Sequence, residues 1–467
     1  MAVAREPILV GQDQIVPLVT GDARPYINLD YAASAPALRA VREALDVLLP
    51  WYSSVHRGAG FKSQVCTAAY EAAREAVRSF CHARTDDAVI FTRNTTDALN
   101  LLAWALPADT KVFTFALEHH ANLLAWTRAG REIQYLPFPA SPDRALAAIE
   151  EALRSSQAGT RLVAVTGVSN VTGEVWPLHR ITELCHSYGA RVAVDAAQLA
   201  PHFPIDLVSI DADYIAFSGH KLYAPFGAGV LVGRADWLRE APPFLFGGGA
   251  VDFVTLSSVT WTSLPDRQEA GSPNVLGAYA MGVACDVLGR RGMQHIADDE
   301  IVLATYARDV LSEVQGIQIY QLWPGMDVPR LGIVTFNLDG MPHSQLAAVL
   351  SAEYGIGVRH GCFCAHPYLQ WLLQCDIAGA ERVRHDIVSG HRENVPGAVR
   401  MSLGLGSSRD DIDALAAALQ EVSRDGPRWS YRLDEPSGEY QPEPDPRLFP
   451  PLPLRPARYG HRGGEAS

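Results

Sequence analysis

Short runs of apolar, often β-branched residues alternate with amphipathic segments through the first half of the chain. The runs predict buried strands, at residues 88–92, 111–116, 161–166, 191–195, 214–218 and 229–233. Apolar residues with helical spacing predict helices between them, at 95–106, 144–154 and 178–188. Strands that alternate with helices form crossovers on a largely parallel sheet, so we expect a three-layer α/β domain.

The pattern changes after this region. Glycine and proline interrupt residues 241–250, and a helical pattern at 275–290 then leads toward a second unit. That unit mixes strand-like and helical patterns, at 332–338, 398–403, 343–354 and 409–423, and predicts a smaller α+β domain. We expect an N-terminal extension (1–27), a large domain (28–290) whose N-terminal part could join the small domain, a small C-terminal domain (291–425) and a disordered Pro-rich tail (426–467).

Composition narrows the class of protein. The chain has 467 residues, of which 48% are hydrophobic and 19% charged, which fits an ordinary globular protein of two domains. A formal net charge of −13 argues against binding of nucleic acid, because phosphate contacts need an excess of Lys and Arg. Seven cysteines are too sparse for a disulfide framework, and no apolar run suits export or membrane insertion, so we expect a cytoplasmic protein.

Lys221 follows the predicted strand 214–218, directly after Ser218, Gly219 and His220. Most lysines lie on the surface, because burial of an ammonium group is costly. In a desolvated or cationic setting, to which His220 could contribute, the pKa of a lysine falls and its amine can form a Schiff base. Lys221 is therefore the first candidate for a catalytic residue.

Asp195 ends the predicted strand 191–195, and Gln198 follows it closely. An aspartate in this place can simply cap the next helix. Alternatively, its carboxylate keeps the ring nitrogen of a pyridine-type cofactor protonated and so strengthens the ring as an electron sink. Gln198 could then donate a hydrogen bond to the phenolic oxygen of that ring.

Polar residues follow two other predicted strands. Thr95 and Thr96 lie at the expected start of a helix, where backbone amides and hydroxyl groups can bind a phosphate. Such residues also cap ordinary helices. His119 follows the strand at 111–116, and it is either a solvated loop residue or an imidazole that stacks on a flat cofactor ring.

Six strings in a fixed order resemble those of the fold-type I, class V aminotransferases: TRNTTDALN, EHHAN, SNVTGE, VDAAQ, FSGHKLYAPFGAG and EAGSPN. The ordered match spans residues 28–425, and the chain is most similar to the group II cysteine desulfurases and selenocysteine lyases. This resemblance implies pyridoxal 5′-phosphate (PLP) as the cofactor of the large domain, and a homodimer. It assigns Lys221 to the Schiff base with PLP and His119 to ring stacking and proton handling.

The resemblance also implies the other contacts with the cofactor. The ring partners would be Asp195, Gln198 and Asn170. The phosphate ligands would be Thr95 or Thr96, Ser218, His220 and, reaching in from a second subunit, Ser272.

Cys364 lies in the string RHGCFCA at 359–365. In the group II desulfurases an Arg-x-Gly-x-x-Cys-Ala string carries the cysteine that forms a persulfide, and Cys364 has this position; the alternative is a buried structural cysteine. The thiolate is the reactive form, and nearby cationic groups such as Arg359 favour it. Cys362 stands where histidine is more usual; in an extended segment it would face the same side as Cys364 and could resolve its persulfide. A lone C-x-C pair is a poor zinc signature, so we predict no metal.

Arg400 stands among apolar residues and resembles the arginine that binds the carboxylate of an amino acid substrate, a task that suits a planar guanidinium. A surface ion pair is the alternative. Other candidates for substrate contacts are Arg359, Asn170, His56 and Arg57. Residues 368–396 form a longer connection than expected, and we predict that they shape the substrate entrance or a partner surface.

These residues favour an enzyme that converts L-cysteine to L-alanine and transfers the sulfur to Cys364 as a persulfide, for delivery to an acceptor such as a sulfur-carrier protein. One alternative keeps PLP but changes the reaction to that of an aminotransferase, epimerase, selenocysteine lyase or C–S lyase. The other alternative is a catalytically quiet PLP-binding partner protein.

Overall fold

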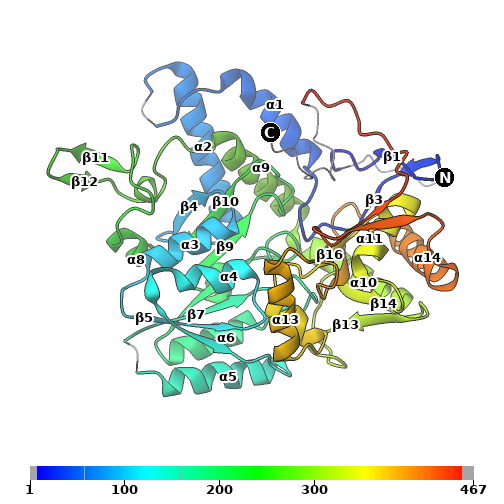
Figure 1. Cartoon of the computed structure of the whole chain (residues 1–467). Helices are drawn as coiled ribbons and strands as arrows, with labels where there is room; N and C mark the ends of the chain where they lie inside the picture. Colours follow the sequence, from blue (N-terminus) through cyan, green and yellow to red (C-terminus); the bar gives the residue numbers. More distant parts are fainter. Residues whose placement is uncertain (1–7, 57, 158, 455–467) are drawn as a thin grey trace, which may run out of the picture.

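A seven-stranded sheet forms the centre of the protein in the computed structural model, which describes residues 8–454 apart from 57 and 158 (Figure 1). Its order is β4–β10–β9–β8–β7–β5–β6. The strands are β4 (Ala88–Thr92), β5 (Thr110–Phe115), β6 (Glu132–Leu136), β7 (Thr160–Thr166), β8 (Arg191–Asp195), β9 (Tyr214–Ser218) and β10 (Gly229–Gly233). Neighbours are parallel except at β10, which runs antiparallel to β4 and β9. The predicted, largely parallel sheet is confirmed.

Helices cover both faces of this sheet. They are α1 (Arg39–Leu48), α2 (Phe61–Phe80), α3 (Thr95–Ala105), α4 (His120–Leu124), α5 (Pro142–Ser155), α6 (Leu178–Ser187), α7 (Leu207–Ile210), α8 (Ala235–Glu240) and α9 (Val275–Arg291). Adjacent strand residues serve different cores: Val89 packs into the cluster that includes α2 and α9, whereas Ile90 packs into the cluster beneath α3. This alternation gives the three layers expected from the sequence.

A second, four-stranded antiparallel sheet has the order β13–β14–β17–β16. Its strands are β13 (Ile317–Tyr320), β14 (Ile333–Leu338), β16 (Arg359–Gly361) and β17 (Ala398–Ser402), and its helices are α10 (Met293–Ser312), α11 (His343–Tyr354) and α14 (Arg409–Asp425). The N-terminal strand β3 (Ile27–Asn28) pairs with β15 (Ile356–Gly357) beside this unit. The exact limits of the two domains stay a prediction.

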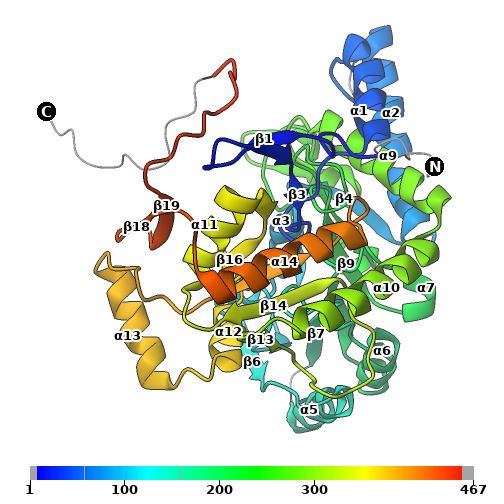
Figure 2. The ribbon, with the colours of Figure 1, turned by 90° about the vertical axis from the view of Figure 1, so that its right-hand side faces the viewer.

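The expected disordered tail is wrong for residues 431–442, which form a hairpin of β18 (Tyr431–Asp434) and β19 (Glu439–Pro442) (Figure 2). The reason is a buried carboxylate on α11. Glu353 accepts hydrogen bonds from the backbone amides of Arg428 and Trp429 and from the hydroxyl of Tyr431, at 2.9, 3.2 and 2.9 Å. Residues 455–467 of that prediction lie outside the described residues.

The remaining strands form two hairpins, β1 (Ile15–Pro17) with β2 (Ala23–Pro25) and β11 (Val251–Val254) with β12 (Val259–Trp261), and the remaining α-helices are α12 (His366–Leu372) and α13 (Ile377–Val388). The hairpin β11–β12 projects from the body (Figure 1). Within the part of the chain that the structure describes, no helix combines the length and apolarity needed to cross a bilayer.

Candidate active site

A cavity of about 260 Å³ brings together most of the residues predicted from the sequence. Among its lining residues are Thr95, Thr96, His119, Asn170, Asp195, Gln198, Ser218, His220, Lys221, Arg359, Cys364 and Arg400. Asp195 and Ser218 are the last residues of β8 and β9, and the carboxyl ends of parallel strands meet at one edge of a sheet. Strand topology therefore gathers side chains that are far apart in the sequence.

Three predicted residues are placed elsewhere or not at all. Ser272 and His56 line a separate cavity of about 520 Å³, where the His56 Nε2 atom lies 3.0 Å from a carboxylate oxygen of Glu71. Ser272 is exposed, so its prediction as a contact to a second subunit stays untested. Arg57 lies outside the described residues.

The start of α3 forms an anion cradle beside β9. Asn94 caps the helix, because its side-chain oxygen accepts a hydrogen bond of 2.9 Å from the amide of Asp97. The amide of Thr95 donates to the Ser218 hydroxyl at 2.8 Å, and the two hydroxyl oxygens lie 2.6 Å apart. Helix amides, two hydroxyl groups and the adjacent His220 thus face one corner of the cavity, as a phosphate site requires.

Gly229 allows this approach of α3 to the sheet, and its replacement by alanine tests the packing. A Cβ atom at this position would lie 2.5 Å from the Asn94 backbone, which cannot move without displacing the helix start. We expect Gly229→Ala to lower the free energy of unfolding by about 1–3 kcal/mol. Thermal melting measures the effect, with Gly60→Ala as the control, since no atom lies within 4 Å of a Cβ there. Equal melting temperatures of both variants would contradict the packing argument.

Lys221 and Asp195 form the chemical centre of the cavity. Lys221 lies in the turn after β9, where its amide donates to the Ser218 carbonyl at 3.3 Å. Burial lowers the pKa of its amine to about 8, although the attraction of Asp195 partly opposes this. Asp195 is 4% exposed, and its carboxylate accepts a hydrogen bond of 3.0 Å from the amide of Ala197; burial raises its pKa.

His119 has a defined tautomer. Its Nδ1 atom accepts a hydrogen bond of 3.1 Å from the amide of Ala121, so the ring proton is on Nε2. Burial, and then the positive charge of Lys221, lower its pKa to about 3. The ring is therefore neutral at physiological pH and presents an N–H donor.

Cys364 lies on a strained turn, and the expected extended segment is wrong. Phe363 and Cys364 have φ of +53° and +56°, a left-handed conformation that is costly for residues other than glycine. The Ala365 amide closes the turn by donating to the Cys362 carbonyl at 2.9 Å. Two hydrogen bonds from other segments also hold it: the Asn170 side-chain amide donates to the Phe363 carbonyl at 2.8 Å, and the His120 amide donates to the Cys364 carbonyl at 2.7 Å. Cys364 is exposed toward the cavity, whereas Cys362 is half-buried against the core.

Arg400 is 3% exposed and has a partner that the sequence analysis missed. Its Nη2 atom donates to Asp30 at 3.2 Å, and its Nη1 atom donates to the Asn170 carbonyl at 2.9 Å. Its Nε–H has no hydrogen-bond partner among the described residues. Arg359 lies opposite Arg400 across the β16–β17 pair, and its Nη1 atom is 3.9 Å from Asp30.

Two arginines thus share one protein carboxylate, which leaves positive charge for an anionic ligand. Burial raises the pKa of Asp30, while Arg400 and Arg359 act in the opposite direction. The string NLDYAAS, which contains Asp30, offered only an acidic residue at the start of the matched region as a signal. Among the residues described, no group of three or more His, Cys, Asp or Glu side chains is arranged to hold a metal.

Comparison with known proteins agrees with this geometry. The sequence model of the aminotransferase class-V family matches residues 27–415. The probable cysteine desulfurase of Halalkalibacterium halodurans is 37% identical, over 85% of this chain and 93% of its own. Solved structures similar to this chain include the cysteine desulfurase of Thermococcus onnurineus NA1 (29% identity, TM-score 0.74) and CsdA from Escherichia coli (33% identity, TM-score 0.71); each match covers 85% of this chain and 95% of the other. The chain therefore belongs to the aminotransferase class-V family, as its motifs predicted, and is related to cysteine desulfurases within it.

Proposed function

We propose that this protein is a PLP-dependent cysteine desulfurase, which converts L-cysteine to L-alanine and accepts the sulfur on Cys364. One observation carries the proposal. A single cavity is lined by a lysine of lowered pKa, a buried aspartate, two arginines that share one carboxylate behind them, and an exposed cysteine on a hydrogen-bonded turn. The names of the relatives at 34–37% identity support the same activity.

The cavity fits PLP. The Oε1 atom of Gln198 is buried and has no hydrogen-bond partner among the described residues, so it can accept one more hydrogen bond; the Nε2 atom, which was predicted to donate to the ring oxygen, donates to the Ala32 carbonyl at 2.8 Å. Asp195 would hold the ring nitrogen, Thr95 with Ser218 the phosphate, and Lys221 the aldehyde carbon. When bound, PLP supplies an electron sink that stabilises negative charge on the substrate.

The residues of the chain would then divide the work. Arg400 and Arg359 bind the substrate carboxylate, for which the unpartnered Nε–H of Arg400 is suited. The Lys221 amine, neutral above a pH of about 8, takes the proton from Cα. The Cys364 thiolate attacks the substrate sulfur: a sulfur–sulfur bond forms, the carbon–sulfur bond breaks, and its electron pair stays with the carbon product. The Lys221 ammonium, which carries the proton taken from Cα, returns it to this product before alanine leaves, while the neutral His119 ring donates a hydrogen bond from Nε2.

The direct test is an assay with L-cysteine and a thiol reductant, in which alanine and sulfide are measured together. We expect the two products in equal amounts, with L-serine as the control substrate that yields neither. Alanine that appears without sulfide, or a 2-oxo acid formed only when a second 2-oxo acid is added, would favour the aminotransferase alternative. No turnover of any amino acid would favour a quiet binding protein.

The pKa of Lys221 leads to a prediction about cofactor uptake. Only the neutral amine attacks an aldehyde, and a pKa of about 8 means that its fraction rises until about pH 9. We expect the rate of PLP capture by the cofactor-free protein to rise about tenfold from pH 7 to pH 9 and then to level off. Stopped-flow absorbance measures this rate. A rate that keeps rising to pH 10 would indicate an unperturbed lysine and contradict the desolvated setting.

The homodimer, the cytoplasmic location and an acceptor protein for the sulfur are further parts of this proposal. The exposure of Ser272 is compatible with a contact to a second subunit. The exposed position of Cys364 suits delivery of sulfur to an external acceptor.

A further inference from the structure

The C-terminal hairpin β18–β19 lies outside the matched region, which ends at residue 415, yet it reaches the edge of the active site. It packs against α11 (Figure 2), and its residue Glu439 contacts β16. β16 is one of the two edge strands of the small sheet, has only three residues, and leads directly into the Cys364 turn. An edge strand this short is paired on one side only, so it depends on other contacts for its position.

The side chains of β16 point alternately to opposite faces. Arg359 lines the cavity and lies opposite Arg400. His360 faces the other way, where its Nε2 atom lies 2.9 Å from a carboxylate oxygen of Glu439 and its Nδ1 atom lies 3.3 Å from the Nδ1 atom of His343 on α11. His360 therefore contacts residues of two elements, Glu439 of β19 and His343 of α11.

Two groups that can only accept hydrogen bonds, the Val395 carbonyl and the Glu439 carboxylate, determine the direction of these hydrogen bonds. The Val395 carbonyl only accepts, so the Nε2 atom of His343, 3.1 Å away, carries a proton. Burial lowers the pKa of His343, which keeps that ring neutral and makes its Nδ1 atom an acceptor. The Glu439 carboxylate also accepts. His360 thus donates to Glu439 from Nε2, and this hydrogen bond lowers the pKa of Glu439.

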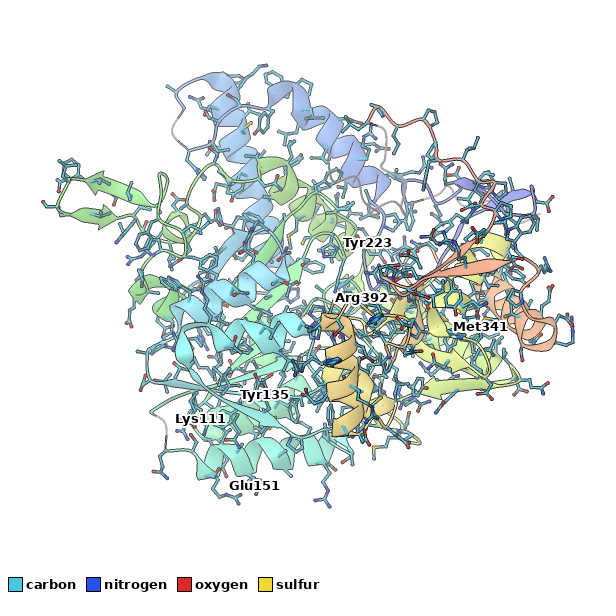
Figure 3. The ribbon with its side chains drawn as sticks, in the orientation of Figure 1. Lys111, Tyr135, Glu151, Tyr223, Met341 and Arg392 are labelled. Carbon is cyan, nitrogen blue, oxygen red and sulfur yellow. The ribbon has the colours of Figure 1, made fainter. Side chains whose placement is uncertain are left out.

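The hairpin is also joined to the segment that leads into β17. Arg392, labelled in Figure 3, donates from its amide to the Glu435 carbonyl at 3.4 Å. At the hairpin turn, a Cβ atom on Gly438 would lie 2.4 Å from the Arg392 carbonyl, so these two segments of the backbone are in close contact. The hairpin therefore contacts β16, which carries Arg359, and the segment before β17, which carries Arg400.

We propose that the C-terminal hairpin is a positioning element of the active site. Glu439 holds His360, and because His360 and Arg359 are neighbours on β16, this contact fixes Arg359 toward the substrate carboxylate. Glu439 and His360 are positioning residues, since neither lines the cavity. The nature of the ligand rests on the proposed function, whereas the mechanical link between hairpin and strand does not.

The test compares Glu439→Ala with Glu443→Ala in the full chain. Glu443 is the matched control, because it directly follows the same hairpin and its exposed ion pair, with Arg432 at 3.1 Å, does not involve β16. We expect Glu439→Ala to raise KM for L-cysteine about tenfold and to change kcat by less than about twofold, because carboxylate binding loosens while the chemical groups stay. Glu439→Gln, which keeps an acceptor for His360, should restore most of the affinity.

Hydrogen–deuterium exchange on the cofactor-free protein gives a second measurement that does not depend on activity. Peptides that cover residues 356–363 should exchange faster in Glu439→Ala than in the wild type or in Glu443→Ala. Unchanged exchange, or the same increase in both variants, would overturn the link. Faster exchange with an unchanged KM would overturn the role of the link in substrate binding. A wild type that fails to turn over L-cysteine would count against the proposed function alone, and exchange would still decide on the link.

Discussion

Lys221→Ala is expected to abolish the visible absorbance band of the lysine-bound cofactor and to reduce alanine formation by at least about a thousandfold. The variant loses both the amine that binds PLP covalently and the base for the Cα proton. The phosphate cradle, with Thr95 and Ser218, and the Asp195 carboxylate stay in place, so PLP should still bind without a covalent link. Absorbance spectra before and after gel filtration distinguish bound from released cofactor.

Lys111→Ala is the matched control for this experiment. Lys111, labelled in Figure 3, is another lysine with a carboxylate partner, 2.6 Å from Glu132, but it lies on β5 and does not line the cavity. It should keep both the band and the activity. Borohydride reduction of the wild type, followed by peptide mapping, should locate the cofactor on the peptide that contains Lys221. A Lys221→Ala variant that retains the band would refute the assignment.

Cys364→Ser should retain the cofactor band but form no protein-bound persulfide, and alanine formation should fall by at least about a hundredfold. A hydroxyl group at this position is neither ionised at neutral pH nor reactive toward sulfur as a thiolate is. Mass spectrometry of the intact protein after incubation with L-cysteine detects the added sulfur. In the wild type it should lie on Cys364.

Cys362→Ser separates the two neighbouring thiols. Cys362 is half-buried against the core, outside the residues that line the cavity, so this variant should keep most of the alanine formation. Undiminished alanine formation in Cys364→Ser would sink the persulfide role of that residue. If only Cys362→Ser lost activity, Cys362 would be the sulfur acceptor. This result would contradict the geometry, in which Cys364 lines the cavity and Cys362 does not.

The central sheet was predictable because strands such as β7 and β8 are buried on both faces and read as continuous apolar runs. β6 was missed because only Leu136, its last residue, is fully buried. Lys221 and Asp195 were candidates for a related reason, since a charged residue at the end of a buried strand, or in the turn directly after it, stands out in the sequence. The position of such residues follows from local pattern and parallel topology.

Other parts of the site depend on contacts that no local pattern records. The left-handed turn at Phe363 and Cys364 involves no glycine at those positions, and is held by side chains and amides from distant segments. The C-terminal hairpin is held by Glu353, a single buried carboxylate on α11. Nothing in the sequence of this helix distinguishes Glu353 from an exposed glutamate. The long connection at 368–396 was recognised, and it contains α13, but its predicted role at the substrate entrance stays a prediction.

The ion pair between Asp30 and Arg400 joins residues 370 positions apart in the chain. During synthesis, Asp30 leaves the ribosome long before Arg400 is added to the chain. Thr95 and Ser218 of the phosphate cradle are separated by only 123 positions. The cradle can therefore assemble on a nascent chain, but the carboxylate-binding corner forms only when nearly all of the protein has emerged. A growing polypeptide would acquire its cofactor site first and its ability to select substrates last.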